Sequence, residues 1–152
     1  MKKRHSTIAS IFIGGLLLYF NLPASSAPPP RIVGKCSNTF IQQVTSRFGA
    51  ETNQFGSDSG ILHFTNGVVV YLYRSLRTTS GWGISHESQP ISLSMARRMF
   101  STNDPVKLCL EYVPSKCREI SGDPRGDIYY ISDYITNDSA YGHVGRNGCG
   151  GA

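Results

Sequence analysis

Charge is scarce in this chain, and none of it forms a block. Only 16% of the 152 residues are charged, and the formal net charge at pH 7 is +5. Three of the 15 basic residues are Lys2, Lys3 and Arg4, which leaves 12 basic against 10 acidic residues in the rest of the chain. Proteins that bind nucleic acid or an anionic membrane concentrate basic residues in a patch or stripe. The absence of such a run argues against both kinds of partner.

A long apolar run is also missing. The run Ile8–Phe20 has 13 residues, whereas a membrane-spanning helix needs about 20. A basic start, a short apolar run and then small residues are typical of a secretion signal. We therefore predict a signal peptide over residues 1–26, cut after Ser26 or, alternatively, after Ala27, and no membrane span once it is removed. No cysteine stands at the cut to anchor a lipoprotein, so we expect a soluble periplasmic or secreted product.

Cysteine is used sparingly, and metal-binding spacing is absent. The four cysteines are Cys36, Cys109, Cys117 and Cys149, and all follow the predicted cut. Zinc sites and EF-hand loops need ligands at intervals that this sequence lacks, so we expect no metal and no cofactor. An even number of cysteines in an exported chain indicates disulfides. We predict two, and the cysteine count alone leaves all three pairings open.

The sequence also lacks a catalytic signature, and we predict that the protein is not an enzyme. It contains no Gly-x-Ser-x-Gly motif or other nucleophile signature. His63 falls inside a β-rich run, which indicates a structural or surface role, and His143 has no identifiable partner. Three aspartates surround Arg125: Asp123, Asp127 and Asp133. A turn held by local hydrogen bonds and an ion pair explains them better than a carboxylate pair for glycoside cleavage.

The first half of the chain contains β-rich segments. Residues 27–35 open with an alanine and three prolines, which indicates a stiff spacer ahead of the fold. Residues 36–48 have some apolar positions at helical spacing, but their β-branched residues favour a strand. The run 61–73 predicts a β-hairpin, because Asn66 and Gly67 at its centre suit a two-residue type I′ turn.

The second half predicts one short helix and two more strands. Pro90 suits the first turn of a helix, and apolar residues recur on one face as far as Phe100, so we expect about three turns there. Alternating hydrophobicity predicts a strand over 106–112, and a run rich in Tyr and Ile predicts another over 128–135. Residues 142–152 are rich in glycine. We expect them to form a tail that its cysteine ties down.

This order of elements is that of a five-stranded OB-like barrel with a helix between the third and fourth strands. We expect one mainly β domain over residues 36–152, with one short helix and two disulfides. The hairpin, the helix and the strand around Cys109 also resemble the B subunit of cholera toxin, an AB5 toxin. The resemblance implies a Cys36–Cys109 disulfide, which leaves Cys117–Cys149 as the second. It also implies a homo-oligomeric ring, formed by pairing of exposed strand edges.

The toxin resemblance has limits. The predicted helix is shorter than the toxin's, and Glu111 stands where that family has a tryptophan, so the known sugar pocket is not carried over. Only the position of the ligand-contacting loop transfers, and it implies Trp82 and His86 as ligand-binding residues. Trp82 is the only tryptophan and lies between two glycines. It either contacts a ligand or folds back on the barrel as a lid, and the sequence does not decide between these.

A second resemblance covers most of the chain after the signal. It rests on the Cys109 to Cys117 segment, on Gly122-Asp123 with Arg125-Gly126, and on the ending Cys149-Gly150-Gly151-Ala152. This pattern is similar to a family of small exported bacterial proteins with four cysteines, uncharacterised in activity. The resemblance implies a class and a compartment, but no function.

These observations predict a non-enzymatic, exported binding module that recognises a glycan or a protein surface. The many tyrosines suit a recognition surface and β-strands equally well, so they do not sharpen this prediction. The alternative is a secreted or periplasmic inhibitor of a hydrolase or toxin, in which a rigid loop plugs an active site. An inhibitor would form a tight one-to-one complex with an enzyme and would not bind sugars.

Overall fold

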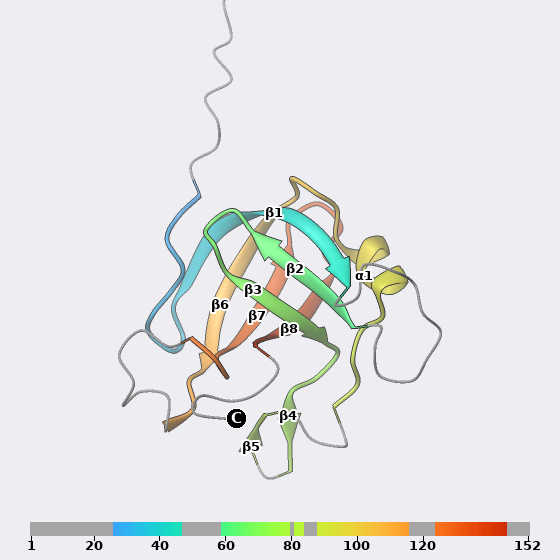
Figure 1. Ribbon diagram of the computed structural model, residues 1–152. Coiled ribbons are helices and arrows are strands. Elements are labelled where there is room, and N and C mark those ends of the chain that lie inside the picture. Colours follow the sequence, from blue (N-terminus) through green and yellow to red (C-terminus); the bar gives the residue numbers. More distant parts are fainter. Residues whose placement is uncertain (1–25, 47–58, 80, 84–87, 116–123, 146–152) are drawn as a thin grey trace, which may run out of the picture.

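The fold is taken from a computed structural model, shown in Figure 1. The structure describes residues 26–46, 59–79, 81–83, 88–115 and 124–145. Residues 1–25 of the predicted signal peptide lie outside these ranges, as do His86, Cys117 and Cys149.

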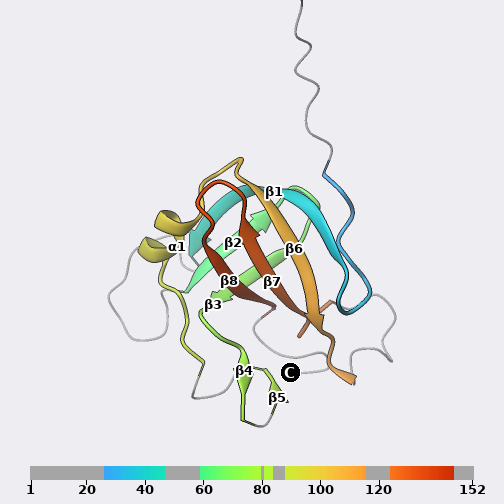
Figure 2. The same cartoon turned by 180° about the vertical axis from the view of Figure 1, so that it is seen from behind.

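Six antiparallel strands form a closed barrel. They are β1 Cys36–Ser46, β2 Gly60–Phe64, β3 Val69–Tyr73, β6 Pro105–Tyr112, β7 Ile128–Asp133 and β8 Ser139–Val144. Strands β1, β2 and β3 form one meander and β6, β7 and β8 form another, and the barrel closes where β1 pairs with β6 and β3 with β8. Along the chain, the segment that joins the two meanders contains a small hairpin and a helix. The hairpin is β4 Arg77–Thr78 with β5 Gly81–Trp82, and the helix is α1 Leu93–Met99. Figure 2 shows this hairpin below the barrel and the helix at its side.

The prediction of a mainly β barrel with one short helix is confirmed, but its five strands are wrong. The missed strand is β8, which overlaps the expected glycine-rich tail. A closed ring in which every neighbouring pair is antiparallel needs an even number of strands, and β8 supplies the sixth. Its Gly142 is buried, and a Cβ atom there would lie 2.5 Å from Val70 Cγ2 and 3.0 Å from Ile131 Cδ1. The glycine that weakens the strand signal is therefore required by close packing.

Strand β1 is shared by both meanders. Its first half, residues 36–40, pairs with β6, and its second half, residues 41–46, pairs with β2. A register shift between Ile41 and Gln43 lies where the strand changes partner. Such bulges bend a strand and increase its twist. The strand predicted over residues 36–48 is therefore confirmed over residues 36–46.

The hairpin predicted over residues 61–73 is confirmed, but its turn type is wrong. The Gly67 N–H donates to the Phe64 carbonyl at 2.9 Å, and the Phe64 N–H donates to the Val68 carbonyl at 2.9 Å. The loop thus has three residues, and of these only Gly67, with φ 86°, has a positive φ. This is the arrangement typical of a type I turn followed by a left-handed glycine. Asn66 contributes through its side-chain oxygen, which accepts the Val68 N–H at 3.2 Å.

Helix α1 begins later than predicted. Ser92 is its N-cap, and the Ser92 hydroxyl accepts a backbone N–H three residues on at 3.3 Å. Pro90 and Ile91 lie before the helix and run alongside β3 instead, where the Ile91 N–H donates to the Leu72 carbonyl at 3.0 Å. The helix therefore has seven residues, about two turns. It packs its apolar face against β1 and β2.

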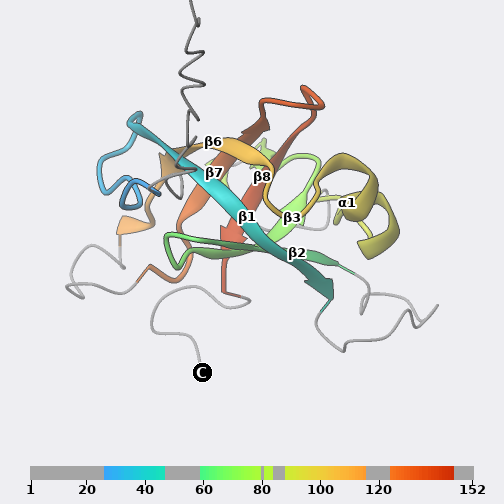
Figure 3. The ribbon, with the colours of Figure 1, turned by 90° about the horizontal axis from the view of Figure 1, so that it is seen from above.

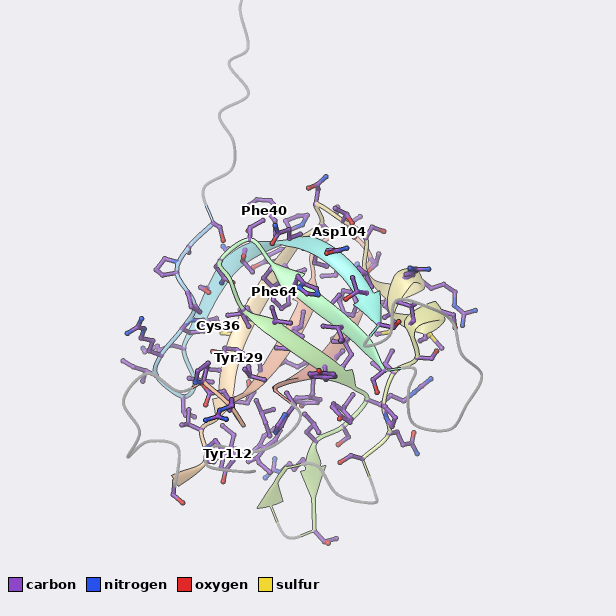
Figure 4. The ribbon with its side chains drawn as sticks, in the orientation of Figure 1. Cys36, Phe40, Phe64, Asp104, Tyr112 and Tyr129 are labelled. Atoms are coloured by element: carbon purple, nitrogen blue, oxygen red, sulfur yellow. A yellow bond between two sulfur atoms is a disulfide. The ribbon has the colours of Figure 1, made fainter. Side chains whose placement is uncertain are left out.

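Apolar side chains fill the barrel interior. Figure 4 marks two of the rings in this core, Phe64 on β2 and Tyr129 on β7. Other large side chains that are fully buried are Phe100, Ile41, Leu62, Leu72, Leu108 and Ile131. Within the described ranges, no helix has the length and apolar character that crossing a bilayer requires.

The expected disulfide between Cys36 and Cys109 is present. The two cysteines lie directly opposite each other on β1 and β6, so the bond joins the two meanders at their seam. The expected Cys117–Cys149 disulfide lies outside the described residues.

The proline-rich lead is more than a spacer. Its Ala27 N–H donates to the Asn38 carbonyl at 3.1 Å, and its Gly34 N–H donates to the Leu110 carbonyl at 2.7 Å. Pro30, between these contacts, is buried. Figure 3 shows the lead on the opposite side of the barrel from α1. The lead is therefore part of the folded domain.

Candidate functional site

Three neighbouring strands place tyrosines in one row on the outer surface of the barrel. The register sets Tyr73 of β3 opposite Tyr141 of β8, and Tyr141 opposite Tyr130 of β7. On β6 the row continues with Cys109, so it ends at the disulfide. Side chains alternate between the two faces of a strand. These tyrosines point outward because their chain neighbours belong to the core: Leu72, Ala140, Tyr129 and Ile131.

The β4–β5 hairpin adds a tryptophan to this row. The ring centroids of Trp82 and Tyr141 lie 5.6 Å apart, and those of Tyr141 and Tyr130 lie 5.5 Å apart. The ring planes are tilted by 57° and 60°, within the range of geometries that aromatic quadrupoles favour. We call Trp82, Tyr141, Tyr130 and Tyr73 the aromatic face. All four side chains are partly exposed.

A cation borders the aromatic face. Arg77 lies directly across the hairpin from Trp82, and its guanidinium carbon is 5.9 Å from the tryptophan ring centroid. This distance allows a cation–π interaction, which holds the guanidinium against the ring. Arg77 is itself exposed. The face therefore combines apolar ring surface with N–H donors that reach solvent.

The structure shows where the Trp82 ring lies. Its ring folds back on the barrel and rests against Tyr141, as the lid alternative predicts, yet part of it stays exposed. The second predicted ligand-binding residue, His86, lies outside the described residues. Trp82 thus contacts Tyr141, which lies between Tyr130 and Tyr73 in a row of tyrosines that the sequence analysis did not select. The pairing register of the strands brings these tyrosines together. In the sequence, they could have been recognised only by the alternate spacing of tyrosines, as in Tyr71 and Tyr73.

A second outward row lies beside the first. Tyr71 stands opposite His143, His143 opposite Ile128, and Ile128 opposite Tyr112. His143 is buried, and its Nδ1 lies 2.7 Å from the Gly145 carbonyl, so Nδ1 carries the proton because a carbonyl only accepts. Burial lowers the pKa of His143, and the bond to Gly145 opposes this shift. The partner of His143 that the sequence did not reveal is therefore a backbone carbonyl.

Burial also raises the pKa of Tyr73 in the aromatic face, with a further contribution from Tyr71. An ionised phenolate would lose hydration there, so the neutral phenol is favoured. At neutral pH, Tyr73 keeps a hydroxyl that can donate and accept hydrogen bonds.

Tyr129 faces the other way, into the core. The pKa of Tyr129 is raised to about 12, chiefly by burial and also by the negative charge of Asp127, while the positive charge of Arg31 opposes the shift. The unfolded chain releases this proton near the ordinary tyrosine pKa of 10.0. Between these two values the unfolded state therefore binds fewer protons than the folded state, so stability falls as pH rises.

We expect this alkaline loss to be measurable. Raising the pH from about 9 to about 11 should cost roughly 1 kcal/mol of unfolding free energy through Tyr129 alone. Urea unfolding of the wild type and of Tyr129→Phe at both pH values tests this, because the variant lacks the ionising hydroxyl. An equal pH dependence in the two proteins would show that Tyr129 ionises as readily in the fold as in the unfolded chain.

The remaining polar candidates have structural roles. His63 is half-buried, with Nε2 2.9 Å from the Thr45 hydroxyl, in line with the predicted structural or surface role. The Oδ1 atom of Asp133 accepts two backbone N–H groups in the turn after β7, at 2.6 and 3.0 Å. Asp127 precedes β7 and Asp133 ends it, so these two carboxylates lie at opposite ends of the strand, and Asp123 lies outside the described residues. Among the described residues, no three His, Cys, Asp or Glu side chains gather to hold a metal.

Comparisons with known proteins found no relative. No protein-family model matches the chain, and neither a curated protein nor a solved structure matches it. The resemblances to the AB5 toxin B subunit and to the four-cysteine exported family therefore remain predictions.

Proposed function

We propose that this protein is a non-enzymatic binding module that recognises a glycan or a protein surface through the aromatic face. The observation that carries the proposal is the contact of Trp82 with the tyrosine row, beside the exposed Arg77. Ring faces stack on the apolar faces of sugars, and Tyr, Trp and Arg are the residue types enriched in protein hot spots. A partner that covers these partly exposed rings would bury apolar area on a surface already held rigid by the barrel.

Export to the periplasm or the exterior belongs to the same proposal. Disulfides persist in oxidising compartments, so the Cys36–Cys109 bond supports it. The proposal also retains a ring of the AB5 type as a possible assembly, but the closed barrel limits how one could form. Strands β2, β3, β6, β7 and β8 each pair with neighbours on both sides. A ring would therefore rely on side-chain surfaces more than on free strand edges.

A glycan array with Trp82→Ala and Tyr141→Ala tests the proposal. We expect each change to weaken binding of a glycan hit by about ten-fold or more, because each removes a ring from the contact. The matched control is Tyr134→Ala, which removes an aromatic ring that is 52% exposed on the turn after β7, outside the aromatic face. The proposal fails if no glycan or purified protein partner binds, or if binding is unchanged in both face variants while their thermal unfolding matches the wild type.

The turn after β7 favours the inhibitor as a second candidate function. It presents Tyr134, 52% exposed, and Ile135, 63% exposed. Asp133 holds its backbone, and the Thr136 hydroxyl donates to the Met99 carbonyl at 3.1 Å. A preorganised loop loses little entropy when it enters a cleft. In this case Tyr134→Ala would weaken a one-to-one complex with an enzyme, and Trp82→Ala would not, so the same variants separate the two functions.

A further inference from the structure

A tight turn in the lead holds two apolar side chains out in solvent. Ile32 is 65% exposed and Val33 is 43% exposed. The Lys35 N–H donates to the Ile32 carbonyl at 3.0 Å, and the Gly34 N–H donates to the Leu110 carbonyl at 2.7 Å. In return, the Leu110 N–H donates to the Lys35 carbonyl at 3.0 Å. The turn is therefore fixed to the end of β6, and the two side chains are exposed on a held backbone.

Two exposed basic side chains, Arg31 and Lys35, flank the apolar pair. We call residues 31–35 the cationic turn. Among the described residues of the neighbouring elements, the acidic side chains are less exposed: Glu111 on β6 is half-buried, and Asp127 before β7 is buried. The charge that the turn presents to solvent is therefore positive.

We propose that the cationic turn is a membrane-surface contact that places Ile32 and Val33 in the headgroup region of an anionic bilayer. Such a surface satisfies both features together, because apolar side chains enter the boundary of the acyl chains while cations remain with the lipid phosphates. The absence of a basic run led us to expect no anionic membrane partner, and the proposal revises that expectation for this small contact. Two cations beside two exposed apolar side chains make a weak, reversible contact.

Another exposed apolar pair on the barrel serves as a control. Tyr134 and Ile135 are exposed to a similar degree, but in the sequence they lie between Asp133 and Asp138. Their turn, between β7 and β8, is separate from the cationic turn in Figure 3, although the Tyr134 hydroxyl donates to Asn38 Oδ1, next to the Ala27 end of the lead. If exposure alone caused membrane binding, this second turn would contribute as well. The cations are what distinguish the cationic turn.

Vesicle co-sedimentation tests the inference without reference to the proposed function. The oxidised protein is purified after export, and its N-terminus is verified by intact mass, because a retained Ile8–Phe20 run would bind vesicles by itself. We expect binding to phosphatidylcholine vesicles that contain phosphatidylglycerol, and weaker binding in high salt. Since each cation contributes about five-fold on an anionic surface, Arg31→Gln with Lys35→Gln should weaken this binding at least about ten-fold.

Further variants make the test specific. Ile32→Ser with Val33→Ser should reduce binding to a similar degree, while the control Ile135→Ser should leave it unchanged. The inference is overturned if the wild type binds neither anionic nor neutral vesicles, or if Ile135→Ser has the same effect as the cationic-turn variants. It is also overturned if the serine variants change the oligomeric state in sedimentation velocity, because the apolar pair is then a contact between copies of the chain.

Discussion

Replacing both Cys36 and Cys109 with alanine is expected to lower the free energy of unfolding by about 4 kcal/mol. The bond closes a long loop, with a sequence separation of 73 residues, so its loss restores much conformational freedom to the unfolded chain. It also removes the covalent link at the seam between β1 and β6. Urea unfolding followed by tyrosine and tryptophan fluorescence measures the change.

Ser37→Ala is the matched control for the disulfide variant. Ser37 is next to Cys36 on β1, and its hydroxyl is a buried group without a hydrogen-bond partner in the described structure. Removing such a group should change the free energy of unfolding by less than about 0.5 kcal/mol, or should stabilise the protein. A loss below about 1 kcal/mol in the double cysteine variant would mean that pairing of the strands holds the seam without the bond.

Gly142→Ala is expected to cost about 3 kcal/mol of unfolding free energy, near the upper end for one extra methyl group in a packed core. The new Cβ would lie 2.5 Å from Val70 Cγ2 and 2.7 Å from Val70 Cβ. The second of these atoms is next to the backbone, so β3 and β8 themselves would have to move. Thermal and urea unfolding measure the loss.

Gly67→Ala separates the effect of crowding from that of backbone conformation. A Cβ at Gly67 meets nothing within 4 Å, but its φ of 86° disfavours any other residue. We expect a cost of about 1 kcal/mol from this conformation alone. If both glycine variants lost the same amount, the close approach of β8 to Val70 would contribute nothing, and the argument for a required glycine at Gly142 would be wrong.

The sequence predicted those helices and strands that are indicated by residues within the element itself. The hairpin, the strand at residues 36–46, the helix and the strands β6 and β7 all lie where β-branched residues, turn residues or a helical apolar face occur. β8 was missed because Gly142 weakens its strand signal, and the reason for Gly142 is a contact with Val70 on β3, far away in the chain. The helix begins three residues after Pro90 because Ile91 pairs with the backbone of β3 instead.

The residues of the candidate site also fall into two groups, those that the sequence indicates locally and those that only strand pairing brings together. Trp82 was selected from the sequence because a single tryptophan between glycines is a local feature. Its partners Tyr141 and Tyr130 follow from the register of β7 and β8, and one of these strands was not predicted at all. The cationic turn depends on backbone bonds between the lead and β6, and no periodicity in the lead indicates them.

The seam between β1 and β6 also bears on the order in which the strands pair during folding. Each meander consists of strands that are neighbours in sequence, and hairpins of this kind form within microseconds. The seam pairs the first strand of one meander with the first strand of the other, and these strands are far apart in the sequence. Pairings between such distant segments are slow to form. Cys36 and Cys109 come to lie opposite each other only when this pairing exists. Oxidation of the pair is therefore a covalent record that β1 and β6 have paired, one of the two pairings that close the barrel, and trapping free thiols during refolding would time that event.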